Sequence, residues 1–468
     1  MTDDTVDISI TIKVEDVAHE FRKNIPISAI EEGVQTMTVA VGQEVLRGVI
    51  NELDERMAEQ VPDNWVNAGT EERWLVCSLG AVRYKRRVYL DERRKRQKPM
   101  DALLGLQRYA RMSGRVQEMG ASLACSGSYR LAADQLSYLT KTAISHSAIQ
   151  RMAWSVGNRI ADGEEAERQR IFEKGEQHEA GKISAPVLYG ESDGVWVHLQ
   201  REKRRSTEVR VAILSTGRKA IGKDRFRLEN KHCFTAVGLN AEKWQEQIVC
   251  EAHRFFDLEQ TSLLISGGDG NQWVRHSFDR LQVRQEFVLD RFHFQRAARR
   301  AFQDHQVARD FVTRFRQEGF ESVQKDLKEQ IQLSTGNRRK KLEDFYRYVH
   351  HNRQVLLDLQ YRGLSQPACL GAIEGNVDKL VVHRMKGRGC SWRLRGVRAM
   401  LALCRNAKSL RCHAYRYIPL QSPGKYIRKP YHLEVEYSDT FQATMPIFQG
   451  PHKNRPWVTY LHKYIHGR

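Results

Sequence analysis

The sequence lacks the cysteine pairs, long apolar runs and basic leader that mark several large classes of protein. Its eight cysteines include no Cys-x-x-Cys pair, whereas a zinc ribbon needs paired knuckles to close a tetrahedral site. No apolar run approaches the roughly 18 residues needed to span a bilayer. The opening MTDDTVDISI is acidic where a secretory signal would be basic and then apolar. We therefore expect scattered, reduced thiols in a cytoplasmic protein with no membrane partner.

Charge of one sign is in clear excess. The 468 residues contain 76 Lys and Arg against 57 Asp and Glu, which gives a net charge of +19. Such a surplus favours a polyanionic partner, and without a spanning segment nucleic acid is preferred over a membrane surface. The hydrophobic content of 41% is sufficient for packed cores. The length exceeds one ordinary core, so we expect about two to four structural units.

The first 180 residues read as helices around one hairpin. Helical periodicity covers about 15 to 60, and strand-like WLVCSL and VRYKRRVYL flank Gly80-Ala81 as a tight turn. The hairpin's basic edge predicts either phosphate contact or a solvated edge protected by charge.

A pair of helices follows the hairpin, in SYRLAADQLSYLTKTAISHSAIQRMAWSVGNRI. Ser145 or Ser147 would cap the second helix. Gln150 and Arg151, with Ser147, would project outward as in a DNA-reading helix, the alternative being an ordinary helical hairpin. The first helix would hold Leu131, Ala132, Leu136 and Leu139 on one face, and the second would bury Ile149, Met152 and Val156.

Strand-like runs dominate residues 181–290 and predict a mixed sheet. One helical stretch, AEKWQEQIVCEAHRFF, precedes the fourth run, and helical, highly charged sequence extends from His293 to about Tyr361. The runs are APVLYGESDGVWVHL, EVRVAILST, HCFTAVGL, SLLISGGDG and EFVLDRFHF.

Three acids stand in an order compatible with a two-metal site. Asp193 in GESDGVWV and Asp269 in ISGGDG each stand at the expected end of a strand and precede a glycine, and Glu374 opens the helix EGNVDKLVVHRMKG. Phosphoryl transfer of this kind needs carboxylates converging on two divalent ions about 3.5–4 Å apart. Mg²⁺ prefers such oxygen ligands. A single Asp-Gly is more often a plain turn, but three such acids in a basic chain favour the metal site.

The ordered motifs ESDGVWV, GGDG, LDRFH and IEGNVD…RMKGRGCSW resemble the transposases of bacterial insertion sequences in the Mutator-like DDE superfamily, with the Lre type closest. The likeness covers roughly residues 70 to 410. It implies that Asp193, Asp269 and Glu374 are the catalytic, metal-binding acids. It also implies that Asp290, which stands where many relatives have Cys, forms an accessory pair with His293.

The resemblance implies an α/β RNase H-like catalytic core with an all-helical insertion, preceded by a mainly helical DNA-binding region. We expect a helical N-terminal region with a basic hairpin at 1–100, a helix-turn-helix-like DNA-binding domain at 101–180, the core at 181–298 and 363–412, the helical insertion at 299–362 and a basic tail at 413–468.

The activity implied is that of a transposase with two Mg²⁺ or Mn²⁺ ions, which cleaves the ends of a mobile element and joins the 3′-hydroxyls to target DNA. Its partners would be double-stranded DNA and further copies of itself, as a homodimer or larger synaptic complex on the bacterial nucleoid. A first rival is a non-enzymatic, domesticated DNA-binding protein with an inactive core. A second is a tyrosine recombinase using Tyr415 or Tyr417, but no Arg-x-x-His-x-x-Arg box accompanies them.

Two basic clusters predict phosphate contact, against the alternative of solvated faces. The smaller contains Arg296, Arg299 and Arg300. The larger runs from the helix of Glu374 onward and contains no acid: Lys379, Arg384, Lys386, Arg388, Arg393, Arg395, Arg398, Arg405, Lys408 and Arg411.

Four further side chains have two readings each. Glu191 shares a strand face with Asp193, where a structural carboxylate is favoured over a metal ligand. His293 either orients a ligand or phosphate or belongs to the core. Trp273 either packs or stacks on a flipped base, packing being favoured. Asp378 competes with Glu374 from nearly the same helix face, but Glu374 has the longer reach.

Overall fold

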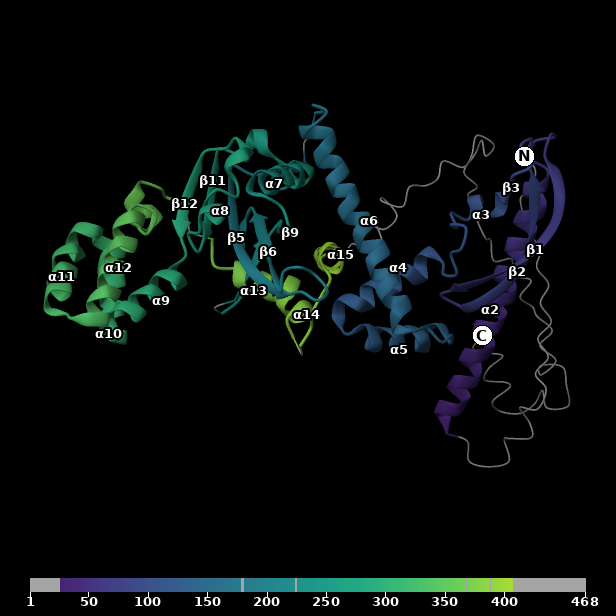
Figure 1. The fold of residues 1–468 in the computed structure, drawn as a ribbon, viewed down its shortest axis with the longest axis horizontal. Coiled ribbons are helices and arrows are strands. Elements are labelled where there is room, and N and C mark those ends of the chain that lie inside the picture. The colour runs from purple at the N-terminus through teal and green to yellow at the C-terminus, as the bar shows by residue number, and fades with distance from the viewer. Residues whose placement is uncertain (1–25, 178–180, 224, 367–368, 388, 407–468) are drawn as a thin grey trace, which may run out of the picture. The chain divides into compact units, whose positions relative to one another are not determined.

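The computed structural model describes residues 26–177, 181–223, 225–366, 369–387 and 389–406 (Figure 1). The chain divides into two compact units. The described residues of one lie within Met1–Gly120 and Arg130–Ile149, and those of the other within Ala121–Tyr129 and Gln150–Tyr417. No helix in the described ranges is long and apolar enough to cross a membrane.

The first unit pairs one long helix with a hairpin. Ile50 of the helix packs with Leu75, Tyr84 and Met100 in a small core. The predicted hairpin is present, but the predicted turn is wrong: Cys77 pairs with Gly80, so the turn is the two residues before Gly80. The elements are α2 (Ile27–Ala58), β1 (Val66–Cys77), β2 (Gly80–Leu90), β3 (Arg96–Gln97), α3 (Pro99–Leu103), and parts of α4 (Gly114–Ser126) and α5 (Tyr129–Thr140).

The basic hairpin of this unit is largely neutralised by neighbouring acids. Each of three arginines on β2 has a carboxylate partner in the same unit. The hairpin therefore offers fewer unpaired cations than its sequence suggests. The pairs are Arg83 with Glu72, Arg86 with Asp101 and Arg87 with Asp54.

The predicted helix pair after the hairpin is α5 and α6 (His146–Phe172). Ser145 caps α6, because its hydroxyl accepts a hydrogen bond from the Ala148 N–H at 3.2 Å. Ile149, Met152 and Val156 are buried as predicted. In α5 the prediction was wrong for Leu131 and Leu139, which are 49% and 53% exposed. The buried face of α5 is instead formed by Ala132, Ala133, Leu136 and Thr140.

A five-stranded mixed sheet organises the second unit, and all five predicted strand regions contribute to it. Its order is β12-β11-β5-β6-β9. β11 runs parallel to both β5 and β12, whereas β6 runs antiparallel to β5 and β9. The strands are β5 (Val187–His198), β6 (Ser206–Ser215), β9 (His232–Val237), β11 (Leu263–Gly268) and β12 (Gln285–Leu289).

Helices cover both faces of this sheet. α7 (Ala241–Phe255) packs its apolar side on one face, where Trp244 and Ile248 meet Leu188 and Phe234. On the other face α13 (Ile373–Val377) packs against β5 and β6, and α15 (Leu394–Arg405) packs against β9. The helix of α13 continues through η4 (Asp378–Val382), a π-helical turn, into α14 (His383–Met385).

The sequence between β12 and α13 is helical, as predicted for the insertion. Its core is rich in phenylalanine, and the ring of Phe294 contacts those of Phe315 and Phe345. In Figure 1 these helices form a bundle beyond β12. They are α9 (Arg291–Phe302), α10 (His305–Glu318), α11 (Phe320–Leu333), α12 (Gly336–Asn352) and η3 (Leu359–Arg362).

Shorter elements complete the unit. β4 and β10 form a two-residue parallel pair, and β7 and β8 form a separate antiparallel ribbon between β6 and β9. Their bounds are β4 (Ile183–Ser184), β7 (Gly217–Gly222), β8 (Arg225–Glu229), β10 (Phe256–Asp257), η1 (Leu258–Gln260), α8 (Gln272–Arg275) and η2 (Asp279–Leu281).

Candidate functional site

Three aspartates come to the same edge of the parallel strands. Asp269 and Asp290 directly follow β11 and β12, while Asp193 lies within β5 at the level where its pairing with β11 has ended. Since β5, β11 and β12 are parallel neighbours, equal register brings the three carboxylates together. The last parallel pairs recorded are Glu191 with Gly267 and Leu289 with Gly268.

The prediction that Asp193 ends a strand is wrong. β5 continues to His198 because its residues beyond Asp193 pair with β6 on the other side, although β11 has stopped. Asp193 is therefore held in a paired strand, and its carboxylate accepts a hydrogen bond from the Gly194 N–H at 2.7 Å. This placement fixes the side chain more firmly than a free strand end would.

The GGDG motif brings β11 close to β5 beside these acids. A side chain added at Gly268 would approach the Ser192 carbonyl oxygen within 2.7 Å, so only glycine fits this position. Asp269 then turns back on its own loop, because its carboxylate accepts hydrogen bonds from the Asn271 N–H at 3.0 Å and from the Asn271 side-chain amide at 2.6 Å. The motif therefore provides both a close contact between β11 and β5 and a turn.

Asp290, His293 and Glu374 form the group best placed to hold a metal ion. One ligand atom from each lies within 4.8 Å of those from the other two. Asp290 caps α9 by accepting from the Phe292 N–H at 3.0 Å, and its other oxygen lies 3.1 Å from Nδ1 of His293. The predicted pair of Asp290 and His293 is therefore formed, and α13 places Glu374 beside it. Asp193 and Asp269, the other two predicted metal ligands, are not members of this group.

The charges of these five side chains act on one another. Burial raises the pKa of Asp193, and the nearby Asp269 raises it further. Burial also raises the pKa of Glu374, which hydrogen-bonds Asp290. Burial pushes the pKa of Asp290 upward, but hydrogen bonds from His293 and the Phe292 N–H lower it overall. The hydrogen bond to Asp290 raises the pKa of His293, with help from Asp269 and Asp193.

This donor set suits a divalent cation of the magnesium type. Carboxylates this close cannot all ionise at low cost, and a bound cation removes that cost while preferring oxygen ligands. Asp290 and Glu374 supply such oxygens, and His293 adds a nitrogen that Mn²⁺ also accepts. Asp193 and Asp269 lie near enough to act on His293 through their charge. The residues therefore fit Mg²⁺ or Mn²⁺.

Glu191 fastens the loop that precedes Glu374, in agreement with the structural reading favoured from the sequence. Its carboxylate accepts hydrogen bonds from the N–H groups of Gly371 at 2.7 Å and Ala372 at 3.1 Å. Glu191 is only 5% exposed, and burial raises its pKa to about 7. Asp378, by contrast, is exposed in the π-helical turn and is not part of the metal-capable group.

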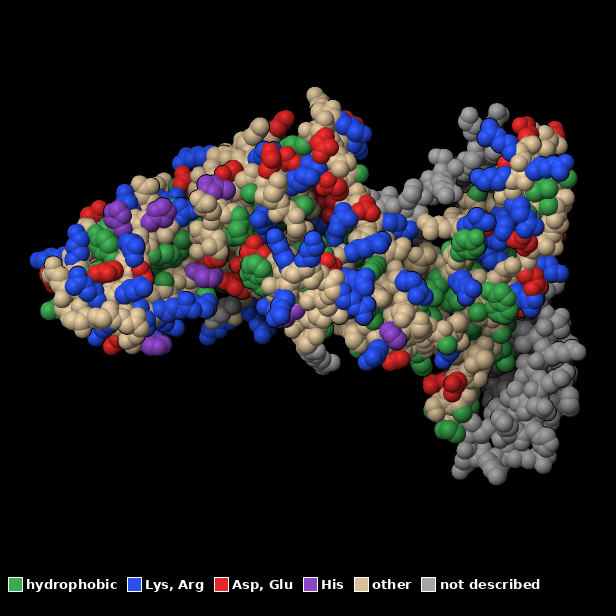
Figure 2. All heavy atoms as spheres, in the orientation of Figure 1, with side chains coloured by type: hydrophobic (Ala, Val, Ile, Leu, Met, Phe, Trp, Pro, Cys, Tyr) green, Lys and Arg blue, Asp and Glu red, His purple; other side chains and the backbone are tan. Residues whose placement is uncertain are grey.

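The predicted DNA-contacting residues divide by exposure. Gln150 is half-buried. The exposed side chains are Lys379, Lys386, Arg393 and Arg395 of the larger cluster, Arg296 and Arg299 of the smaller, and Arg151 on α6. Figure 2 shows Lys and Arg side chains over much of the visible face. Arg388, Lys408 and Arg411 lie outside the described residues, as do Tyr415 and Tyr417 of the recombinase alternative.

The prediction of phosphate contact is wrong for Arg384. Its guanidinium is buried between the rings of Tyr129 and Trp392, at 5.1 and 4.8 Å from their centroids. It also donates a hydrogen bond to the Ala124 carbonyl oxygen at 2.5 Å. Arg384 therefore holds α4 against α14 and does not face solvent.

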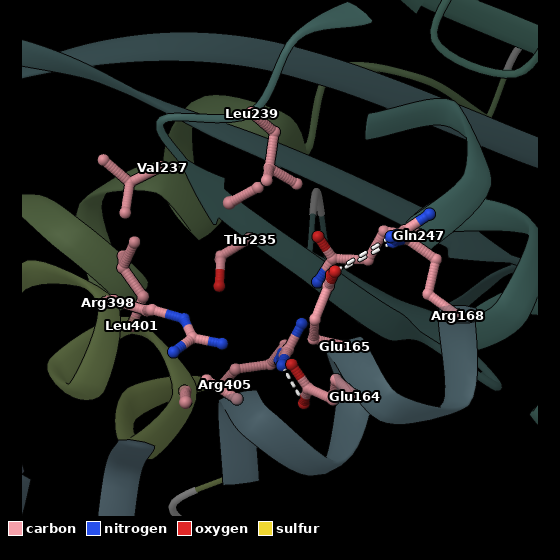
Figure 3. Close-up of a pocket in the computed structure, with 13 residues that line it drawn as sticks. Glu164, Glu165, Arg168, Thr235, Val237, Leu239, Gln247, Arg398, Leu401 and Arg405 are labelled. Atoms are coloured by element: carbon pink, nitrogen blue, oxygen red, sulfur yellow. Dashed lines mark hydrogen bonds and ion pairs between the residues drawn. The ribbon is translucent and has the colours of Figure 1, made fainter. Parts of the chain in front are cut away.

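One hollow of this unit is lined by a network of ion pairs. It holds about 60 Å³ beside β9 and is lined by α6, α7 and α15 (Figure 3). Its arginines are already paired: Arg168 with Glu246, Arg398 with Asp162 and Arg405 with Glu164. Two members of the larger basic cluster are thus engaged internally.

Two minor expectations are confirmed among the described residues. Trp273 packs edge-on against Trp244, and the Arg210 guanidinium lies 4.9 Å from its ring, so its packing reading holds. The described cysteines are all free thiols. From the sequence, Asp290 was assigned only an accessory role. Its spacing of three residues from His293 is the signal that the two side chains lie on one helical turn.

Comparison with known proteins identifies the family of this chain. Residues 21–412 match the uncharacterised protein family UPF0236, and the chain belongs to it. A UPF0236 protein of Caldanaerobacter subterraneus subsp. tengcongensis, whose name joins eleven locus designations, is 23% identical over 402 residues, covering 85% of this chain and 81% of that protein. Two others from the same organism, one named with a single locus and one with four, are each 22% identical over 391 and 386 residues, covering 81% of this chain and 78% of each.

Proposed function

We propose that this chain is a DDE-type transposase, a metal-dependent enzyme that cuts and joins DNA on an RNase H-like core. The observation that carries the proposal is the metal-capable group of Asp290, His293 and Glu374, beside which the register of three parallel strands brings Asp193 and Asp269. The strand order supports it, since an RNase H-like sheet has its first three strands antiparallel and its last two parallel to the first, as do β5, β6, β9, β11 and β12.

The names of the relatives add independent support. One carries eleven locus designations and another carries four. A single coding sequence recorded at many loci is what a self-propagating DNA element leaves in a genome. The excess of cations over acids in this chain agrees with a DNA substrate.

The reaction is a pair of phosphoryl transfers that need no energy-rich cofactor. In the first, a water oxygen bonds to the phosphorus at the element's end, and the bond from phosphorus to the 3′-oxygen breaks to leave a 3′-hydroxyl. In the second, that hydroxyl attacks a target phosphate, so one phosphodiester forms as another breaks. Two divalent ions, when bound, would activate the attacking oxygen and stabilise the leaving one.

The chain's own residues supply the positioning. Asp193 lies in β5 and Asp269 directly follows β11, and Glu374, at the start of α13, hydrogen-bonds Asp290. Glu191 fixes the loop before Glu374 by accepting its N–H groups. His293 lies with its Nδ1 3.1 Å from Asp290, where it can orient that carboxylate.

The test is cleavage of labelled DNA carrying the inverted repeats that flank the gene. The proposal predicts cutting that exposes 3′-hydroxyls in Mg²⁺ or Mn²⁺ and stops with a chelator. Binding without any cutting in either metal would instead favour the non-enzymatic DNA-binding alternative. A covalent protein–DNA adduct trapped by quenching would favour the tyrosine recombinase. We further propose that two or more copies assemble to hold both element ends.

A further inference from the structure

The β7–β8 ribbon is a free-standing arm with no role in the site described above. Its two strands pair only with each other, in a sheet separate from the five-stranded one. An isolated two-stranded ribbon is marginally stable in water. Of its described side chains only Gly217 is buried and Leu228 partly so, and Ile221 and Phe226 are 62% and 55% exposed. We propose that this ribbon lies in a groove of duplex DNA beside the carboxylate cluster, an inference that rests on the proposed function.

Three cations of the ribbon share one face, which also carries Glu229. Lys219 stands directly opposite Arg227, and Arg225 opposite Gly222. Because alternate residues of a strand share a face, Lys219, Arg225 and Arg227 point the same way. Like charges directly opposed across two strands destabilise the pairing. A polyanion bound along this face would offset that repulsion, because its negative charges attract the three cations.

The other face carries the apolar Phe226 and Leu228 together with Arg218. Ala220 pairs with Phe226 there, and the Arg218 guanidinium lies 4.5 Å from the Phe226 ring. A solvated arm has no need of an exposed phenylalanine, but a groove offers apolar contacts such as the thymine methyl group. The combination of a cationic face with apolar side chains suits nucleic acid better than a purely ionic partner.

The root of the ribbon connects it to the candidate site. Lys231, between β8 and β9, donates a hydrogen bond to the side-chain oxygen of Asn376 at 2.6 Å. Asn376 lies on α13, two residues after Glu374. DNA bound at the carboxylates would therefore lie close to where the ribbon leaves the sheet.

Duplex DNA is the partner that this shape admits. The major groove is wide enough for a two-stranded β-ribbon, and phosphates flank it on both sides for the cations. A bulge between Ala220 and Gly222 adds local twist to the ribbon, which helps it to follow a helical groove. The alternative, that the cations only keep an exposed ribbon from aggregating, makes no demand on DNA.

The experiment compares DNA binding by the full-length wild type with that of Lys219→Ala/Arg225→Ala/Arg227→Ala over a range of salt concentrations. Three lost phosphate contacts should reduce the slope of log affinity against log salt by about 2.7, since each contributes about 0.9. Methylation of guanine N7, in the major groove, should weaken the wild type and not this variant. The matched control is Arg338→Ala/Lys340→Ala/Lys341→Ala on α12, which removes three exposed cations elsewhere and should leave the slope unchanged.

Each outcome decides something different. The ribbon variant could keep the slope and affinity of the wild type while the wild type binds DNA and shows Asp193-dependent cleavage. That result would overturn the ribbon proposal and leave the proposed function standing. A wild-type protein that neither binds nor cuts duplex DNA would overturn both. Should the triple variant unfold, Lys219→Gln/Arg227→Gln replaces it, with an expected reduction of about 1.8.

Discussion

The burial of Glu191 makes stability depend on pH in a predictable direction. Burial raises the pKa of Glu191 from 4.5 to about 7. A raised folded-state pKa means that the stabilisation is fully present below pH 4.5 and is lost as pH rises through about 7. One pKa unit corresponds to about 1.4 kcal/mol, so the charged form above pH 7 lowers the unfolding free energy by about 3 kcal/mol.

Glu191→Gln removes this charge and keeps a hydrogen-bond acceptor of the same size. Between pH 5 and pH 8, the unfolding free energy of the wild type should fall by about 2–3 kcal/mol relative to that of the variant. Urea denaturation of the protein in chelator, at several pH values, measures this difference. Glu318→Gln, which changes an exposed carboxyl, serves as the control and should show no such trend. A Glu191→Gln difference that is constant with pH would refute the reasoning.

Three further predictions concern other residues. Glu374→Gln should abolish cleavage, whereas Asp378→Asn should lower the cleavage rate about tenfold, or by about 1.4 kcal/mol of barrier. Cleavage assays in Mg²⁺ and Mn²⁺ measure both, and an inactive Asp378 variant beside an active Glu374 variant would reverse the assignment. If Arg151 reads a base edge, Arg151→Ala should relax sequence preference at one position by about 1–3 kcal/mol, which binding to a panel of mutated end sequences would reveal or disprove. Arg384→Ala should lower the unfolding free energy by about 2–4 kcal/mol because it removes a buried cation–π contact with Trp392 and a charged hydrogen bond, and unchanged thermal unfolding would count against the buried role.

Local pattern predicted the strands and helices well, because their signals lie within a few residues. The five strand regions of the sheet, the start of α6 and the helical nature of the insertion follow from alternation, capping and periodicity. Errors arose where tertiary packing chose between equivalent local patterns. Leu131 and Leu139 are apolar, but the smaller Ala132 and Ala133 face inward.

The candidate site was predictable in its acids but not in its supporting contacts. Their positions next to glycines indicate Asp269 and Glu374 as candidate site residues. The hydrogen bond from Gly371 to Glu191 joins residues 180 positions apart, and the contact of Arg384 with Ala124 spans 260. Nothing in one sequence indicates such partners, so Arg384 looked like its exposed neighbours. Long-range contacts decide which charges are buried.

The most direct test of the account is the rate at which 3′-hydroxyl ends appear on labelled element-end DNA in Mg²⁺. The wild type is compared with Asp193→Asn and Asp269→Asn, which keep side-chain volume but remove a metal-binding charge. Each variant should lose about a thousandfold in rate, or about 4 kcal/mol of barrier, while binding the same DNA with near-normal affinity, since phosphate contacts lie elsewhere. Near wild-type cleavage by both variants would contradict the two-metal assignment.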